Sequence, residues 1–73
     1  MERFLNMRET ENRHIKAERK AILSIGRGER IEILYTGEEK AAKKAKTIQE
    51  RFRGTGVLLQ ISAVGESVYV KKM

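Results

Sequence analysis

Hydrophobic and polar positions group into two pairs of short β-like stretches. Residues 21–25 (AILSI) and 30–35 (RIEILY) are rich in β-branched residues and flank the glycine-containing sequence GRGE, which predicts a β-hairpin. Residues 57–64 and 68–70 are apolar runs separated by the turn sequence GES, which predicts a second hairpin. Each hairpin is antiparallel, so the pattern predicts four antiparallel strands.

The segment between the two hairpins has the marks of a helix at both ends. Thr36 is followed three residues later by Glu39, the spacing of a capping box. At the other end, basic residues lead up to Gly54, which is typical of a helix C-terminus. One face of this expected helix is apolar and should lie against the sheet; it carries Ala41, Ala45, Ile48 and Phe52.

The N-terminal segment has a different composition. Residues 2–18 contain no glycine or proline and are rich in Glu, Arg, Lys and Met, which predicts a helix with a thin apolar stripe. We therefore expect an N-terminal helical extension over residues 1–18 and a single small domain over residues 19–73. The predicted fold is α+β, with a four-stranded antiparallel sheet made of two β-hairpins joined by a central helix (ββαββ).

Alternation along the strands assigns the two faces of the expected sheet. The helix-facing set is Leu23, Ile25, Ile31, Ile33, Tyr35, Leu59, Ile61, Val68 and Val70. The opposite face is half apolar, and something should cover it. The candidate protein-interface residues on that face are Ile22, Leu34, Leu58 and Tyr69. Tyr69 is the one exposed-looking aromatic there, and single-strand binders stack bases on successive aromatics, so packing is its favoured role.

The chain has 73 residues, which allows one small domain whose core stabilises it only marginally. It contains no cysteine, so no disulfide can add stability, and burial against a second copy is a reasonable alternative. We therefore expect a homodimer. The longest apolar run is far too short to span a bilayer, and charged residues interrupt the N-terminus where a signal peptide would need an apolar region. These features predict a cytoplasmic protein without a membrane partner.

Candidate catalytic chemistry is sparse. The chain has one histidine, His14, and no aspartate, so neither a catalytic triad nor a metal site can be assembled by residue type. The two glycine-containing loops lack the Lys and Ser or Thr that follow a phosphate-binding loop. We expect no enzymatic activity, no cofactor and no bound metal.

Positive charge is the strongest functional signal. Sixteen Lys and Arg stand against ten acids, all of them Glu, which gives a net charge of +6. The expected phosphate-contacting residues are Lys40, Lys43, Lys44 and Arg51 on the central helix, with Arg27 and Arg30 at the first hairpin. Such a set predicts a small basic protein that binds nucleic acid, DNA or RNA, with an affinity that falls steeply with salt. The alternative is a small inhibitory or regulatory protein that docks onto an acidic protein surface through its exposed sheet face or N-terminal helix.

Overall fold

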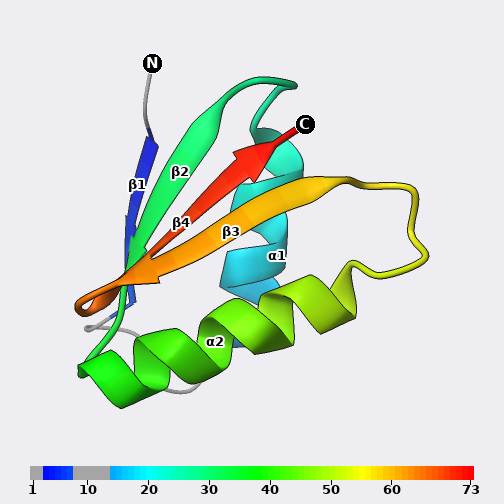
Figure 1. The fold of residues 1–73 in the computed structure, drawn as a ribbon. Coiled ribbons are helices and arrows are strands. Elements are labelled where there is room, and N and C mark those ends of the chain that lie inside the picture. The colour runs from blue at the N-terminus through cyan, green and yellow to red at the C-terminus, as the bar shows by residue number, and fades with distance from the viewer. Residues whose placement is uncertain (1–2, 8–13) are drawn as a thin grey trace.

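The computed structural model describes residues 3–7 and 14–73, which fold into one sheet and two helices (Figure 1). The elements follow the chain in this order: β1 (Arg3–Asn6), α1 (His14–Ser24), β2 (Arg30–Leu34), α2 (Glu38–Arg51), β3 (Leu59–Val64) and β4 (Ser67–Lys72). The strand order in the sheet is β1-β2-β4-β3. Strand β1 runs parallel to β2, whereas β2–β4 and β3–β4 are antiparallel. The α+β class and the number of strands are confirmed, but the sheet is mixed rather than antiparallel and the ββαββ order is wrong.

Residues 21–25, predicted as a strand, form the last turn of α1 and the residue after it. Tertiary packing overrides the local β-propensity here, because a helix places most apolar residues of this segment on the one face that packs against the sheet. Glu18, Ile22 and Ile25 lie at spacings of four and three residues, and all three are buried. Leu23, predicted in the core, points away from it and is 46% exposed.

The end of α1 is held by the last strand. Lys72 Nζ donates hydrogen bonds to the carbonyl oxygens of Leu23, at 3.1 Å, and of Ile25, at 2.8 Å. A cation at this position satisfies carbonyl groups that have no partner within the helix and offsets the negative end of its dipole. Lys72 therefore fixes the exit of α1 against β4.

The predicted helix over residues 2–18 is replaced at its start by β1. Residues 14–18 are helical, residues 3–6 form the strand, and residues 1–2 and 8–13 lie outside the part of the chain that the structure describes. Strand β1 pairs with β2 in the register Phe4↔Glu32. A parallel pair needs a crossover connection, and α1 belongs to it. This pairing partner is almost 30 residues away, so nothing in the local sequence reveals it.

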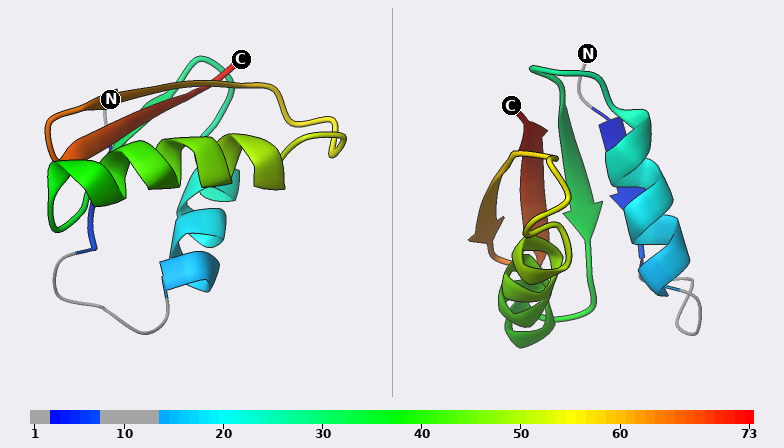
Figure 2. Two further views of the ribbon diagram at one scale, coloured as in Figure 1. Left: turned by 60° about the horizontal axis from the view of Figure 1, so that its bottom comes forward. Right: turned by 90° about the vertical axis from the view of Figure 1, so that its right-hand side faces the viewer.

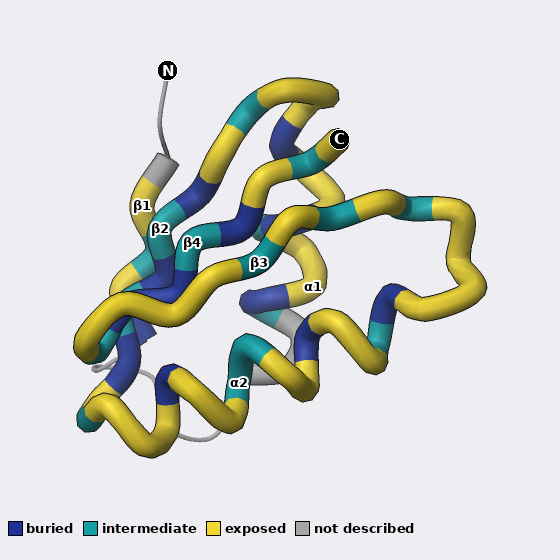
Figure 3. Tube along the Cα trace, in the orientation of Figure 1, coloured by how far each residue is buried: buried dark blue, intermediate teal, exposed yellow. Residues whose placement is uncertain are grey.

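Both helices lie on the same face of the sheet (Figure 2). The core lies between the sheet and the helices. Figure 3 colours the buried residues of both dark blue. The buried hydrophobic residues are Met7, Ile22, Ile25, Ile31, Ile33, Tyr35, Ala41, Ile48, Phe52, Val68 and Val70. The predicted helix-facing positions of β2, α2 and β4 are thus confirmed, while Ile22, predicted on the opposite face, lies in this core.

Helix α2 and the β3–β4 hairpin occupy the places that the sequence predicts, although α2 is capped differently. Its N-cap is Gly37, with no side-chain cap hydrogen bond, so the predicted capping box of Thr36 does not form. Instead, Gly37 N donates to Glu66 Oε2 at 2.9 Å and ties the helix start to the β3–β4 turn. Gly37 has a φ of 97°, a conformation that favours glycine.

Candidate nucleic-acid interface

The basic residues of α2 fall into two groups because α1 lies beside this helix. Lys40, Lys43 and Lys46 are exposed on the solvent side. Lys44 and Arg51 project from the flank that faces α1, and their side chains are only 18% and 20% exposed. The predicted stripe of basic residues is therefore divided, with Lys40 and Lys43 facing solvent and Lys44 and Arg51 facing α1.

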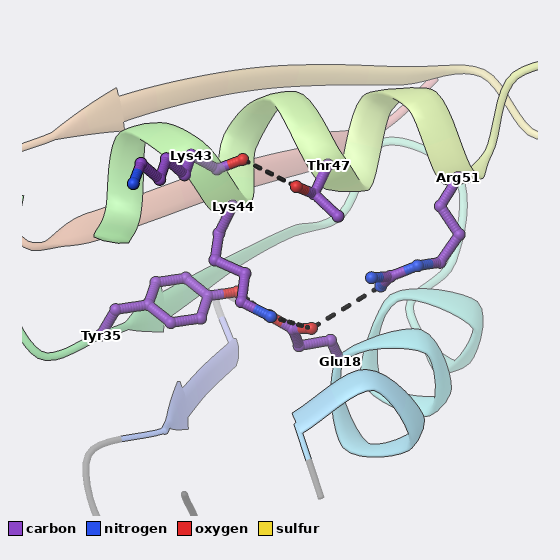
Figure 4. Close-up of polar contacts among 6 residues, drawn as sticks. All are labelled: Glu18, Tyr35, Lys43, Lys44, Thr47 and Arg51. Carbon is purple, nitrogen blue, oxygen red and sulfur yellow. Dashed lines mark hydrogen bonds and ion pairs between the residues drawn. The ribbon is translucent and has the colours of Figure 1, made fainter. Parts of the chain in front are cut away.

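Lys44 and Arg51 converge on a buried carboxylate, that of Glu18 on α1 (Figure 4). Lys44 Nζ lies 3.4 Å from Glu18 Oε1, and Arg51 Nη1 lies 3.6 Å from the same oxygen. The hydroxyl of Tyr35, just after β2, donates a hydrogen bond to Glu18 Oε2. The Glu18 side chain is completely buried, and burying a carboxylate is costly unless hydrogen bonds and opposite charges surround it, as these three partners do.

The Glu18 cluster, made of Glu18, Tyr35, Lys44 and Arg51, joins both helices to the end of β2. Burial raises the pKa of Tyr35 far above its ordinary value, and the hydrogen bond to Glu18 and the charge of Glu18 add to that rise. Tyr35 therefore keeps its proton and stays a donor to the carboxylate. The arrangement holds the helices together, and it makes Lys44 and Arg51 poor candidates for contacts with external phosphates.

The other two predicted basic residues lie elsewhere. Arg27 is exposed in the turn between α1 and β2. Arg30 opens β2 on the outer face of the sheet, the face opposite the helices, and its guanidinium carbon lies 5.7 Å from the centroid of the Tyr69 ring. Helix α2 lies on the other face of the sheet, so Arg30 and the lysines of α2 do not converge on one surface. The six predicted residues thus occupy four separate places: two on α2, one in the turn before β2 and one on the outer face.

The four predicted interface residues do not form one surface either. Ile22 is completely buried in the core. Leu34 and Tyr69 are half-buried on the outer face, as predicted. Leu58 is 70% exposed, but it lies in the loop between α2 and β3.

One residue on the outer face was not expected there from the sequence. Phe4 was predicted on a helix, but in β1 it lies opposite Glu32 and is 58% exposed. A shallow hollow on the same face lies over β2, β4 and β3; its lining is Arg30, Glu32, Gln60, Ile61, Ser62, Val64, Tyr69 and Lys71.

Acidic and basic side chains are distributed differently over the molecule. Of the twelve Lys and Arg side chains whose burial the structure describes, nine are exposed, whereas only three of the seven described Glu side chains are. The four remaining acids each accept a hydrogen bond within the protein: Glu18 from Tyr35, Glu29 from Gly26, Glu32 from Ser67 and Glu66 from Gly37. The surface of the described part is therefore more positive than the composition alone implies.

Within residues 3–7 and 14–73, no group of three or more His, Cys, Asp or Glu side chains is placed to hold a metal ion. Neither of the two described helices is long and apolar enough to cross a membrane.

Comparisons with protein-family models, curated proteins and solved structures found no match to this chain.

Proposed function

We propose that this protein is a non-enzymatic nucleic-acid-binding protein that contacts phosphates through its exposed lysines and arginines. The observation that carries the proposal is the unequal placement of charge. Most described cations reach solvent, while most described acids bond internally. Such a surface attracts a polyanion and releases the counterions condensed on it.

Two groups of exposed basic residues are available for phosphate contact, and the exposed Arg27 lies apart from both. Lys40, Lys43 and Lys46 lie on the solvent side of α2, and Arg30 and Lys71 lie opposite each other on the outer face of the sheet. Lys44 and Arg51 are excluded from this role because they are paired with Glu18.

Fluorescence anisotropy with labelled single-stranded and duplex oligonucleotides over a salt series tests the proposal. We expect log Kd to rise linearly with log salt, with a slope corresponding to several released ions. Charge reversal at Lys43 and Lys46, or at Arg30 and Lys71, should weaken binding and lower that slope by about one for each phosphate that is no longer neutralised. Lys44→Gln, one residue from Lys43 but turned toward Glu18, is the control and should leave the slope unchanged, with circular dichroism verifying that the variant is folded because it removes one partner of Glu18. Absence of binding at low salt would overturn the proposal.

We also propose that two copies of the chain pair through β3, the edge strand beside β4. Residues 57–65 contain no charged side chain, although 36% of the chain is charged. Protective lysines, prolines or a covering element usually prevent an edge strand from pairing with another chain. The β3 sequence LQISAV has no lysine and no proline, and its last three residues are exposed. Antiparallel pairing of β3 with its copy would give a symmetric homodimer with one continuous sheet.

A further inference from the structure

The helices leave the outer face of the sheet uncovered. In β2, Ile31 and Ile33 point toward the helices and are buried, so Arg30 and Glu32 point to the other side. In β4, the same alternation turns Tyr69 outward. Both helices lie on the inner side (Figure 2), and no element of the described chain covers the outer face.

Two aromatic rings stand at the same level on this face. Phe4 pairs with Glu32, Glu32 pairs with Tyr69, and Tyr69 pairs with Ser62, so the four residues form one row across all four strands. Phe4 and Tyr69 are two strands apart, a separation of about 10 Å at the usual spacing between strands. Phe4 is 58% exposed, so much of its side chain is accessible from solvent.

Basic side chains form the next row on the same face, two residues along each strand from the aromatic row. Arg30 pairs with Lys71, Lys71 pairs with Gln60, and all three are exposed. The Arg30 guanidinium lies near the Tyr69 ring, at 5.7 Å from guanidinium carbon to ring centroid, so one residue links the basic and aromatic rows. The face thus offers planar apolar surfaces beside cationic ones.

Glu32, the acid in the aromatic row, indicates which part of a nucleic acid would fit the centre of the outer face. Glu32 stands between the two rings, and its Oε2 accepts a hydrogen bond from Ser67 Oγ at 2.8 Å. A carboxylate repels phosphate but accepts hydrogen bonds from base amino groups. The centre of the face therefore suits bases, and the row of Arg30 and Lys71 suits phosphates.

We propose that the outer face binds single-stranded nucleic acid, with bases stacked on Phe4 and Tyr69 and phosphates against Arg30 and Lys71. Stacking requires bases whose flat faces are accessible, which an intact duplex does not offer. Single strands are bound in other proteins on four-stranded sheets whose exposed aromatic side chains stack on two or three bases. The inference rests on the proposed function and narrows it to one face and one form of nucleic acid.

The test measures the affinity of the full chain for a labelled single strand and for a duplex of the same length. Phe4→Leu and Tyr69→Leu should each weaken single-strand binding about tenfold while leaving duplex binding unchanged. Leu58→Ala is the matched control, because Leu58 is also a large exposed apolar residue but lies off this face. Circular dichroism verifies that each variant is folded.

The possible outcomes separate the inference from the proposed function. If neither aromatic variant changes single-strand affinity, while charge reversal at Lys43 and Lys46 weakens binding, the stacking face is refuted and nucleic-acid binding stands. If the unmodified protein binds neither form at low salt, both proposals fail. NMR provides a second readout: the single strand should shift the ring signals of Phe4 and Tyr69 and leave those of the buried Tyr35 in place, and the reverse result would overturn the inference.

Discussion

Glu18 has surroundings that differ from those of every other described acid. Its side chain is fully buried between the helices, with a tyrosine hydroxyl on one oxygen and two cations near the other. The residue types alone predict Lys44 and Arg51 on a solvent-facing stripe, because they do not reveal where the N-terminal helix runs. No local pattern reveals that an acid on one helix faces the flank of another, so the cluster could not be predicted from this single sequence.

Removing the carboxylate of Glu18 should destabilise the protein strongly. In Glu18→Ala, Lys44 and Arg51 are left close together and mostly buried without a counter-charge, which we expect to lower the free energy of unfolding by about 2–3 kcal/mol. Glu18→Gln keeps the side-chain volume and an acceptor for Tyr35, and it should cost less. Urea denaturation followed by circular dichroism measures both values.

The control is Glu50→Gln, which removes an exposed acid whose ion pair with Arg53 spans 4.0 Å. Exposed pairs of this kind contribute about 0–1 kcal/mol, so its unfolding midpoint should barely move. Equal effects of the changes at Glu18 and Glu50 would contradict the buried cluster.

Tyr35 should make the free energy of unfolding depend on alkaline pH. Its pKa is raised in the folded protein, whereas in the unfolded chain it is about 10. Above that pH the unfolded chain releases the proton and the folded protein retains it. The stabilisation is therefore complete below pH ~10 and is lost as the pH rises, by about 1.4 kcal/mol per pH unit.

The measurement uses Tyr69→Phe, in which Tyr35 is the single tyrosine. Tyrosinate absorbance should then appear together with the loss of helical circular dichroism. Comparison with Tyr35→Phe separates this effect from lysine titration, since that variant should lose less stability per pH unit above pH ~10. Ionisation of Tyr35 in a protein that is still folded would refute the buried hydrogen bond.

At the scale of elements, predictions were correct where one local signal dominates, and wrong where the pairing partner is distant or two local signals compete. Helix α2 carries its apolar face and its closing Gly54 within one short segment, and the β3–β4 hairpin carries its own turn at Gly65. Strand β1 has no such signal, because it exists only by parallel pairing with β2. Helix α1 did carry one: Glu18, Ala21, Ile22 and Ile25 share a helical face, but the buried acid interrupts the apolar pattern, and the β-branched run dominated the interpretation.

The start of α2 distinguishes the cap seen in the structure from the cap expected from the sequence. Gly37→Ala should lower the free energy of unfolding by about 1–3 kcal/mol, because φ 97° and ψ 147° are strained for a residue with a Cβ. Apart from its two chain neighbours, no residue has an atom within 4 Å of the position of that Cβ, so the cost comes from the local backbone alone.

Thr36→Ala provides the comparison for this prediction. Thr36 makes no cap hydrogen bond, so thermal or urea unfolding should show a change below about 0.5 kcal/mol. A loss near 1 kcal/mol, the usual effect of removing a capping side chain, would favour the capping box instead.

At the scale of the whole molecule, the net charge of +6 affects the two proposed associations in opposite directions. Nucleic-acid binding joins opposite charges and releases counterions, so salt weakens it. Pairing of two copies through β3 brings like charges together, so salt screens their repulsion and strengthens it. A salt series that records both affinity and mass therefore separates the two processes in one protein.

The edge of β3 is where the dimer can be tested directly. Ala63→Lys places a charge on an exposed position of the uncharged strand, which is how natural edge strands avoid pairing. We expect sedimentation equilibrium to give twice the chain mass of 8.4 kDa for the unmodified protein and the single mass for Ala63→Lys. Ala42→Lys adds the same charge at an exposed site on α2 and should remain dimeric. Two results would show that β3 is not the interface: a monomeric unmodified protein at high salt, or an Ala63→Lys variant that still dimerises. Each outer face would then have to bind its nucleic acid without a second face alongside it.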